Sequence, residues 1–193
     1  LTPMPDYTLP FPGRELAEQE LSYDPCYEKI PPEDRPKIVE AAWSKGEAAA
    51  KRIFEKFGGE RDFRKIAEKS GLKVCPKDTD YVVGRQRYFS DYLSGTNEIN
   101  LYLKSVALWA EQNRMSPEDA QNVILSHEYY HFLECNEIGL TSRDYSVPML
   151  RLGRLKIGST GIRALSEIGA HAFARTYYEQ LQQEENGNER TTV

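Results

Sequence analysis

The stretch SPEDAQNVILSHEYYHFLECNEIG, residues 116–139, contains the strongest helix signal in the chain. Ser116 suits an N-cap and Pro117 suits the first helical position, and two acidic residues follow in the first turn, where they complement the helix dipole. Apolar residues recur through the middle of the stretch, and Gly139 is typical of a helix end. The pattern predicts one helix from residue 117 to near residue 139.

This helix carries the sequence His127-Glu128-Tyr129-Tyr130-His131, an HExxH motif. Residues four apart on an α-helix differ by roughly 40° in direction, so the imidazoles of His127 and His131 point the same way. Two neutral imidazoles at this spacing can chelate one Zn²⁺, and Glu128 lies close enough to contact a water molecule at the metal. The sequence therefore predicts one zinc ion per chain, with His127 and His131 as ligands and Glu128 as the catalytic base.

A catalytic zinc site usually has three protein ligands and leaves a fourth position for water. The residues that follow the second histidine are weak candidates for the third ligand. In the metzincin arrangement a glycine turn would stand at Glu134 and the ligand at Glu137, but without that glycine Glu137 stays on the helix and faces elsewhere. Cys135 shares the face of His131 but lies one turn too far along, so we expect it to be a buried thiol of the core.

The last predicted helix, residues 161–183, offers better candidates. Glu167 and His171 are four residues apart and share a face, and small residues around them allow close packing against a neighbouring helix: Gly169, Ala170, Ala172 and Ala174. A carboxylate from a second helix commonly completes a zinc site with two histidines. We predict Glu167 as the third ligand. His171 is expected to hydrogen-bond a ligand imidazole, with the alternative that it is itself the ligand.

The rest of the chain predicts an α+β fold, mostly helical, with a small three-stranded sheet. We expect a Pro-rich N-terminal arm that is extended and poor in helix (1–33), the main domain (34–183) and a polar flexible tail (184–193). Within the domain we expect helices at 34–57, 61–70 and 104–114, strands at 72–75, 80–93 and 97–103, and a loop-like region at 141–160.

Composition excludes several classes of protein. The chain has 193 residues and a net charge of -5, which argues against non-specific nucleic-acid binding. No apolar stretch is long enough to span a membrane, and no secretory signal is visible. The three cysteines are widely separated, so a disulfide framework is not expected. We therefore expect a cytoplasmic protein.

Two motifs together carry a resemblance to a known family: His127-Glu128-x-x-His131 and Glu167-x-x-Ala170-His171-x-Phe173-Ala174. The pair resembles the ImmA/IrrE-type zinc metallopeptidases, and the resemblance covers residues 40–183, including a strand that ends Asn100-Leu101-Tyr102-Leu103. It implies a compact, cytoplasmic, zincin-like domain of the gluzincin type. It also implies that the substrate is a protein partner, a helix-turn-helix transcriptional repressor.

The segment between the two motif helices is basic. Residues 141–163 contain five basic side chains and one acidic one, whereas the chain as a whole is acidic. The simpler interpretation is a solvated loop. The alternative is a flap near the cleft in which Arg151, Arg154 and Lys156 bind an acidic segment of the substrate.

The motifs predict a zinc-dependent endopeptidase. Glu128 favours catalysis, because a purely structural metal site needs no base. Two alternatives stay open: a metal-containing protein that sequesters a regulator without cutting it, and a hydrolase of a small amide. A donor to the developing oxyanion is also needed, and the candidates are His171, Tyr145, Tyr177 and Tyr178.

Overall fold

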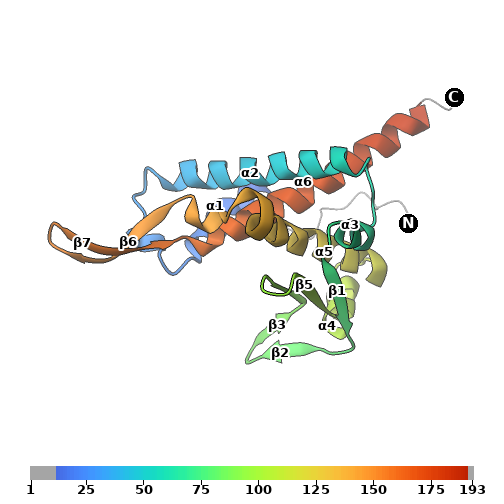
Figure 1. Cartoon of the computed structure of the whole chain (residues 1–193), viewed down its shortest axis with the longest axis horizontal. Coiled ribbons are helices and arrows are strands. Elements are labelled where there is room, and N and C mark those ends of the chain that lie inside the picture. Colours follow the sequence, from blue (N-terminus) through green and yellow to red (C-terminus); the bar gives the residue numbers. More distant parts are fainter. Residues whose placement is uncertain (1–11, 191–193) are drawn as a thin grey trace.

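The computed structural model describes residues 12–190 and has the α+β architecture expected (Figure 1). Its main helices are α1 (Ala17–Ser22), α2 (Arg35–Lys56), α3 (Phe63–Lys69), α4 (Leu103–Gln112), α5 (Pro117–Leu133) and α6 (Arg163–Arg190). Its strands are β1 (Lys73–Lys77), β2 (Tyr81–Val83), β3 (Gln86–Tyr88), β4 (Ser90–Leu93), β5 (Glu98–Tyr102), β6 (Ser146–Leu152) and β7 (Leu155–Gly161). Among the helices of residues 12–190, none is long and apolar enough to cross a membrane.

Helix α6 packs against α2 on one side and against α5 on the other (Figure 1). Glycines allow this close approach. A Cβ atom at Gly46 of α2 would collide with the carbonyl oxygen of Gly169 on α6, and a Cβ atom at Gly169 would collide with the hydroxyl of Tyr130 on α5. The expectation that small residues let the last helix pack closely is therefore confirmed.

The three-stranded sheet has the order β1-β5-β4. β1 is parallel to β5, and β4 is antiparallel to β5 with Ser90 opposite Leu101. β4 is thus an edge strand, and it packs against the motif helix α5. Ile99 and Leu101 of the central strand are fully buried in the core, which holds this sheet beside α5.

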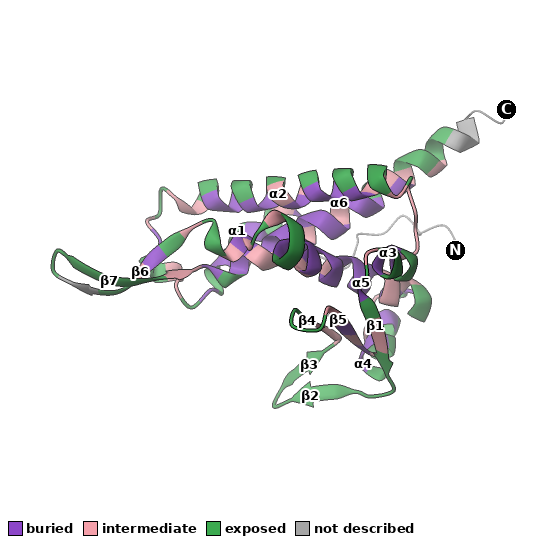
Figure 2. Cartoon of the chain, viewed as in Figure 1, coloured by how far each residue is buried: buried purple, intermediate pink, exposed green. Residues whose placement is uncertain are grey.

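Two clusters of buried side chains form the core (Figure 2). The larger one surrounds the aromatic rings of Phe63, Tyr129, Phe173 and Tyr177, which pack mainly edge to face. The smaller one joins α1, the first half of α2 and the start of α6. Both clusters include residues of α6, so this helix links the two parts of the core.

The N-terminal segment differs from its prediction within the described residues. Residues 12–33 contain a 3₁₀ turn (η1, Arg14–Leu16), α1 and a second 3₁₀ turn (η2, Tyr27–Lys29), whereas we expected an extended surface arm. Ala17, Leu21 and Ile30 are buried in the smaller cluster, so burial against α2 and α6 orders the segment. The first 11 positions of the predicted arm lie outside the described residues.

Other predicted boundaries are also wrong. The loop expected at 141–160 is largely the hairpin β6–β7, and the single strand expected at 80–93 is three short strands, with Gly84 (φ 62°) in the turn between β2 and β3. Pro76 lies within β1 instead of ending it, which an edge strand tolerates. Residues 184–190, expected to form a flexible tail, continue helix α6.

Candidate metal centre

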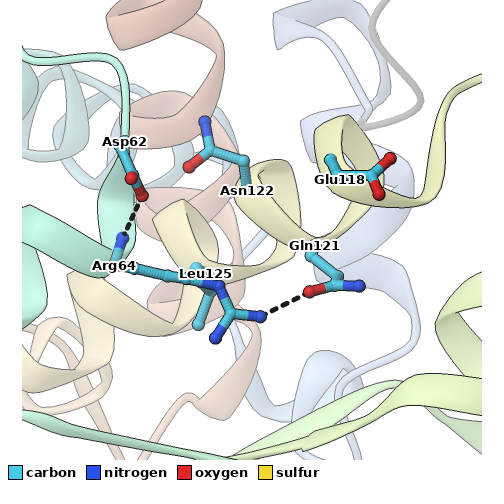
Figure 3. A pocket seen from close by; sticks show the side chains of 6 residues that line it. All are labelled: Asp62, Arg64, Glu118, Gln121, Asn122 and Leu125. Carbon is cyan, nitrogen blue, oxygen red and sulfur yellow. Dashed lines mark hydrogen bonds between the residues drawn. The ribbon is translucent and has the colours of Figure 1, made fainter. Parts of the chain in front are cut away.

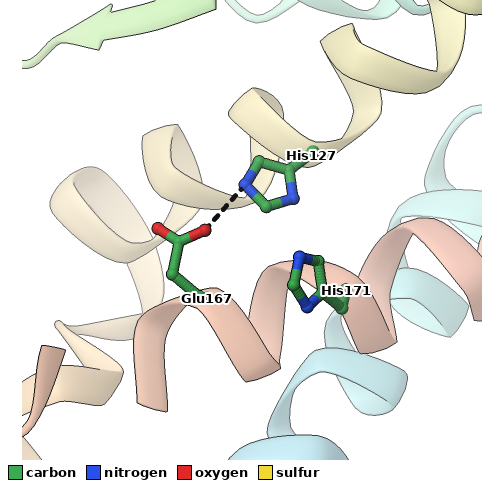
Figure 4. A group of neighbouring side chains, drawn as sticks. All are labelled: His127, Glu167 and His171. Carbon is green, nitrogen blue, oxygen red and sulfur yellow. Dashed lines mark ion pairs between the residues drawn. The ribbon is translucent and has the colours of Figure 1, made fainter. Parts of the chain in front are cut away.

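Local sequence places the HExxH motif on α5 as predicted. The Ser116 hydroxyl accepts a hydrogen bond from the Asp119 amide at 3.1 Å and caps the helix, which runs through His131 to Leu133. A π-helical turn (η3, Glu134–Ile138) follows and ends at Gly139, with φ 78°. Helix α6 supplies Glu167 and His171 to the same place, and Figure 4 shows their side chains pointing toward His127.

Three side chains meet at short range. The Nε2 atoms of His127 and His131 are 3.3 Å apart. One oxygen of Glu167 is 3.1 Å from Nε2 of His127, and its other oxygen is 3.4 Å from Nε2 of His131. Tetrahedral zinc with ligand bonds of about 2.0–2.1 Å requires ligand atoms about 3.3 Å apart. The donor set and its spacing therefore fit a zinc ion.

His171 lies beside this group. Ligand-type atoms of His127, Glu167 and His171 all lie within 4.8 Å of one another (Figure 4). The ring of His171 is tilted against that of His127, with centroids 5.2 Å apart. Two sets of three thus share His127 and Glu167. The donor atoms of the set with His131 approach one another more closely, at 3.1–3.4 Å, with Glu167 meeting the two imidazoles through different oxygens, so we favour His131.

The charges of the centre are complementary. Burial by itself would raise the pKa of Glu167, but hydrogen bonds with His127 and His131 outweigh burial and hold that pKa far below its ordinary value. Burial lowers the pKa of His131, yet hydrogen bonds with Glu134 and Glu167 raise it well above its ordinary value. Burial, followed by the charge of His127, lowers the pKa of His171 to about 3. The carboxylates thus favour positive charge here, which a divalent cation also supplies.

Glu134 is a functional candidate that sequence reasoning considered only as the position of a missing glycine turn. Its side chain is buried, with 3% of its surface exposed. One carboxylate oxygen accepts a hydrogen bond from Nδ1 of His131 at 2.9 Å. The other accepts from the Thr141 amide at 2.8 Å and from the Ser166 hydroxyl at 2.9 Å. Glu134 therefore orients His131 with Nε2 toward the centre and joins the end of α5 to the start of α6.

Replacing Glu134 with Gln is expected to weaken zinc binding by about 10- to 100-fold, the usual cost of losing a hydrogen-bond partner of a metal ligand. Competition with a chromophoric chelator would measure the zinc affinity. Glu137→Gln is the matched control, because it removes a carboxylate from the same turn that pairs with Arg52 and not with the centre. Equal zinc affinity in wild type and Glu134→Gln would contradict this role.

Glu128 is close to the centre but is not among the three meeting side chains. It is 8% exposed, and its Oε1 accepts a hydrogen bond from the Ser90 hydroxyl at 2.6 Å. Ser90 is the first residue of the edge strand β4, so the sheet orients the predicted base. The sequence offered no signal for this contact, because Ser90 and Glu128 are 38 residues apart.

An open cleft of about 570 Å³ leads to the centre. Glu128 and Glu167 lie in its wall, together with Tyr88 and Ser90 from the strands and Ser142 and Arg163 from the other rim. A smaller hollow of about 290 Å³ adjoins it and includes His171. The cleft therefore runs between the β3–β4 region and the start of α6, with the predicted base in its wall.

The proposed oxyanion donors fare differently. The Tyr177 hydroxyl donates a hydrogen bond to the backbone carbonyl of Glu60, and the Tyr145 hydroxyl donates to the Asp34 carboxylate. The Tyr178 hydroxyl accepts from the Asn122 side chain. None of these three tyrosines lines the cleft or the smaller hollow. His171 lines the smaller hollow. Tyr88, which sequence reasoning missed, lines both hollows, so His171 and Tyr88 are the candidates that the geometry retains.

The predicted substrate-binding arginines and lysine are not beside the metal centre. Arg151, Arg154 and Lys156 belong to the β6–β7 hairpin, which projects from one end of the molecule (Figure 1), and Arg154 and Lys156 do not line the cleft. Arg163, from the same basic segment, does line it.

Helix α1 brings a further acidic residue, Glu20, near the metal centre, which the sequence did not predict. Burial, and next the charge of Glu167, raise the pKa of Glu20.

A further hollow of about 250 Å³ lies between α3 and α5 (Figure 3). Most of its polar residues form hydrogen bonds: Asp62 accepts from the Arg64 amide, and the guanidinium of Arg64 contacts Gln121. Asn122 accepts from the Phe63 amide at 2.8 Å. The contacts of Arg64 with Gln121 and of Phe63 with Asn122 join α3 to α5, so we interpret this hollow as part of the packing between the two helices.

Comparison with protein-family models, with curated proteins and with solved structures returned no match for this chain.

Proposed function

We propose that this protein is a zinc-dependent endopeptidase. The observation that supports it best is the close approach of His127, His131 and Glu167: the two Nε2 atoms lie 3.3 Å apart, and the two carboxylate oxygens of Glu167 lie 3.1 Å from one and 3.4 Å from the other, a donor set that suits one zinc ion. A carboxylate held beside these three side chains, Glu128, adds the base that hydrolysis needs. The two sequence motifs resemble those of the ImmA/IrrE-type peptidases, a family of zinc peptidases with a zincin-like fold, and this resemblance agrees with the proposal.

The proposed chemistry uses these residues in separate roles. A zinc ion held by His127, His131 and Glu167 would acidify water and polarise the substrate carbonyl. Glu128 takes the proton of the attacking water and returns it to the nitrogen of the leaving amine. The Ser90 hydroxyl holds the Glu128 carboxylate in place, and His171 or Tyr88 donates a hydrogen bond to the oxyanion.

An extended peptide is the substrate that the cleft suits. β4 pairs with β5 on one side only, and Ser90 of β4 lies in the cleft wall, so backbone groups at this sheet edge can pair with a peptide strand. This favours a polypeptide substrate over a small amide. The family resemblance extends the proposal to a protein partner, a DNA-binding transcriptional repressor, and to a cytoplasmic setting.

Removal of zinc is expected to abolish peptide cleavage, and re-addition of one equivalent is expected to restore it, because the proposed site holds a single ion. The experiment treats the purified protein with a chelator, digests an unselected peptide library and maps internal cleavage by mass spectrometry. Elemental analysis of the reloaded protein gives the zinc content. Failure to retain zinc, or cleavage that the chelator leaves unchanged, would contradict the proposal.

A further inference from the structure

The β6–β7 hairpin exposes an unusual number of large apolar side chains. Met149, Leu150, Leu155 and Ile157 are 60%, 50%, 59% and 45% exposed. Figure 2 shows the hairpin projecting from the body with mostly exposed residues along it. Clustered exposed apolar side chains on a soluble protein usually mark an interaction surface.

The pairing of the two strands separates apolar from basic positions. Leu150 stands opposite Ile157, which places both on one face, whereas Lys156, the residue between Leu155 and Ile157, faces the other way. Arg154 lies in the turn that joins the strands. One face of the hairpin therefore carries the aliphatic side chains of Leu150, Leu155 and Ile157, and the other face carries Lys156 together with Met149.

The outer edge of β7 is open to a further strand. Among the described strands, β6 and β7 pair only with each other. On the β6 side, the Lys29 ammonium donates to the carbonyl oxygen of Met149 at 2.8 Å, so a side chain already meets the backbone there. The backbone groups along the outer edge of β7 are thus the better place for strand addition.

The base of the hairpin is continuous with the cleft. The Ile162 amide, just after β7, donates to the carbonyl oxygen of Ser142 at 2.8 Å, and the Ser142 amide donates to the Ser166 hydroxyl at 3.2 Å. Ser142 and Arg163 both line the cleft. A polypeptide lying along β7 can therefore continue into the proposed active site.

We propose that the β6–β7 hairpin binds a strand of the protein substrate in which acidic and aliphatic side chains alternate. Such a strand, paired with the edge of β7, places aliphatic side chains beside Leu155 and Ile157 and acidic ones beside Lys156 and Arg154. This inference deepens the proposed peptidase function and rests on it for the identity of the partner as substrate. A membrane fits less well, because basic positions occupy the end of the hairpin that would enter the lipid.

The test measures binding separately from cleavage, with full-length Glu128→Gln protein. The probe is a short fluorescent peptide of alternating Glu and Val, compared with an isomer that has the Glu and Val residues in separate blocks. Fluorescence anisotropy is expected to show at least about tenfold tighter binding of the alternating peptide, weakened by salt. N-methylation of alternate amides in the peptide is expected to abolish binding, because it blocks pairing with β7.

Hairpin variants complete the test. Arg154→Glu with Lys156→Glu is expected to weaken peptide binding by about tenfold or more. Lys51→Glu with Lys56→Glu, two exposed lysines of α2, is the matched control and should bind as the parent does. Equal binding of the two isomers, or binding that the hairpin variant leaves unchanged, would overturn the proposal. So would hairpin-dependent binding to anionic phospholipid vesicles without binding of the alternating peptide.

Cleavage by the wild-type protein keeps the two proposals distinguishable. Zinc-dependent cleavage of unselected peptides together with no hairpin-dependent binding would overturn the strand-binding surface and leave the peptidase assignment standing. Hairpin-dependent binding of the alternating peptide without any zinc-dependent cleavage would overturn the peptidase assignment, while the surface would remain as a site for an acidic, alternating strand.

Discussion

Glu128→Gln protein is expected to bind zinc like the wild type and to lose peptide cleavage by a factor of about 10²–10⁴. Gln has nearly the shape of Glu, and its amide oxygen can still accept the hydrogen bond from Ser90. The amide cannot take up a proton from water at neutral pH, so only the general-base step is removed. Single-turnover kinetics on a cleavable peptide, together with elemental analysis for zinc, would measure both quantities.

Glu137→Gln is the control for this prediction. It removes a carboxylate that pairs with Arg52 away from the centre, and cleavage should stay near the wild-type rate. The sequestering hypothesis predicts something different: wild type and Glu128→Gln would then bind a partner alike, and neither would shorten it.

Because Glu128→Gln should hold a substrate without cutting it, pull-down with this variant also identifies the partner, which we expect to be a transcriptional repressor.

The parts of the site that the sequence predicted are those set by position along one helix. The capping of α5 by Ser116 and the four-residue spacing of His127 and His131 depend on local geometry, and the structure has both as expected. The small residues of α6 signalled a close helix contact, and Gly169 does lie against Tyr130 of α5. Local periodicity therefore predicted two helices of the site and their close packing.

The parts that the sequence missed depend on contacts between distant segments. The hydrogen bond from Ser90 to Glu128 requires that β4 be the sheet edge beside α5, and strand order cannot be read from periodicity. Glu134 gains its partners Thr141 and Ser166 only because the chain turns sharply after α5. Aliphatic and basic residues alternate around Leu150 in the sequence, but Pro148 and two glycines in the same segment favour a loop, and only the pairing of β6 with β7 reveals the hairpin.

Glu167→Ala protein is expected to lose zinc affinity by more than about 100-fold. This exceeds the loss of about 10- to 100-fold that is typical when only a hydrogen-bond partner of a metal ligand is removed. Glu167 is the group of α6 whose two oxygens lie 3.1 and 3.4 Å from the two imidazoles, so its removal takes away one of three donors. His171→Ala, on the same face of the same helix, is expected to change zinc affinity by about tenfold or less. Competition with a chelator would give both affinities, and circular dichroism would show that each variant is folded.

The pair of variants separates three coordination schemes. A large loss in Glu167→Ala alone fits an open site with His127 and His131, in which the fourth position remains for water. A large loss in His171→Ala with full affinity in Glu167→Ala would move the third ligand to His171. Large and equal losses in both variants would indicate four protein ligands, a closed site of the structural kind, and would contradict hydrolysis at this centre, because no position would remain for the water that Glu128 is placed to deprotonate.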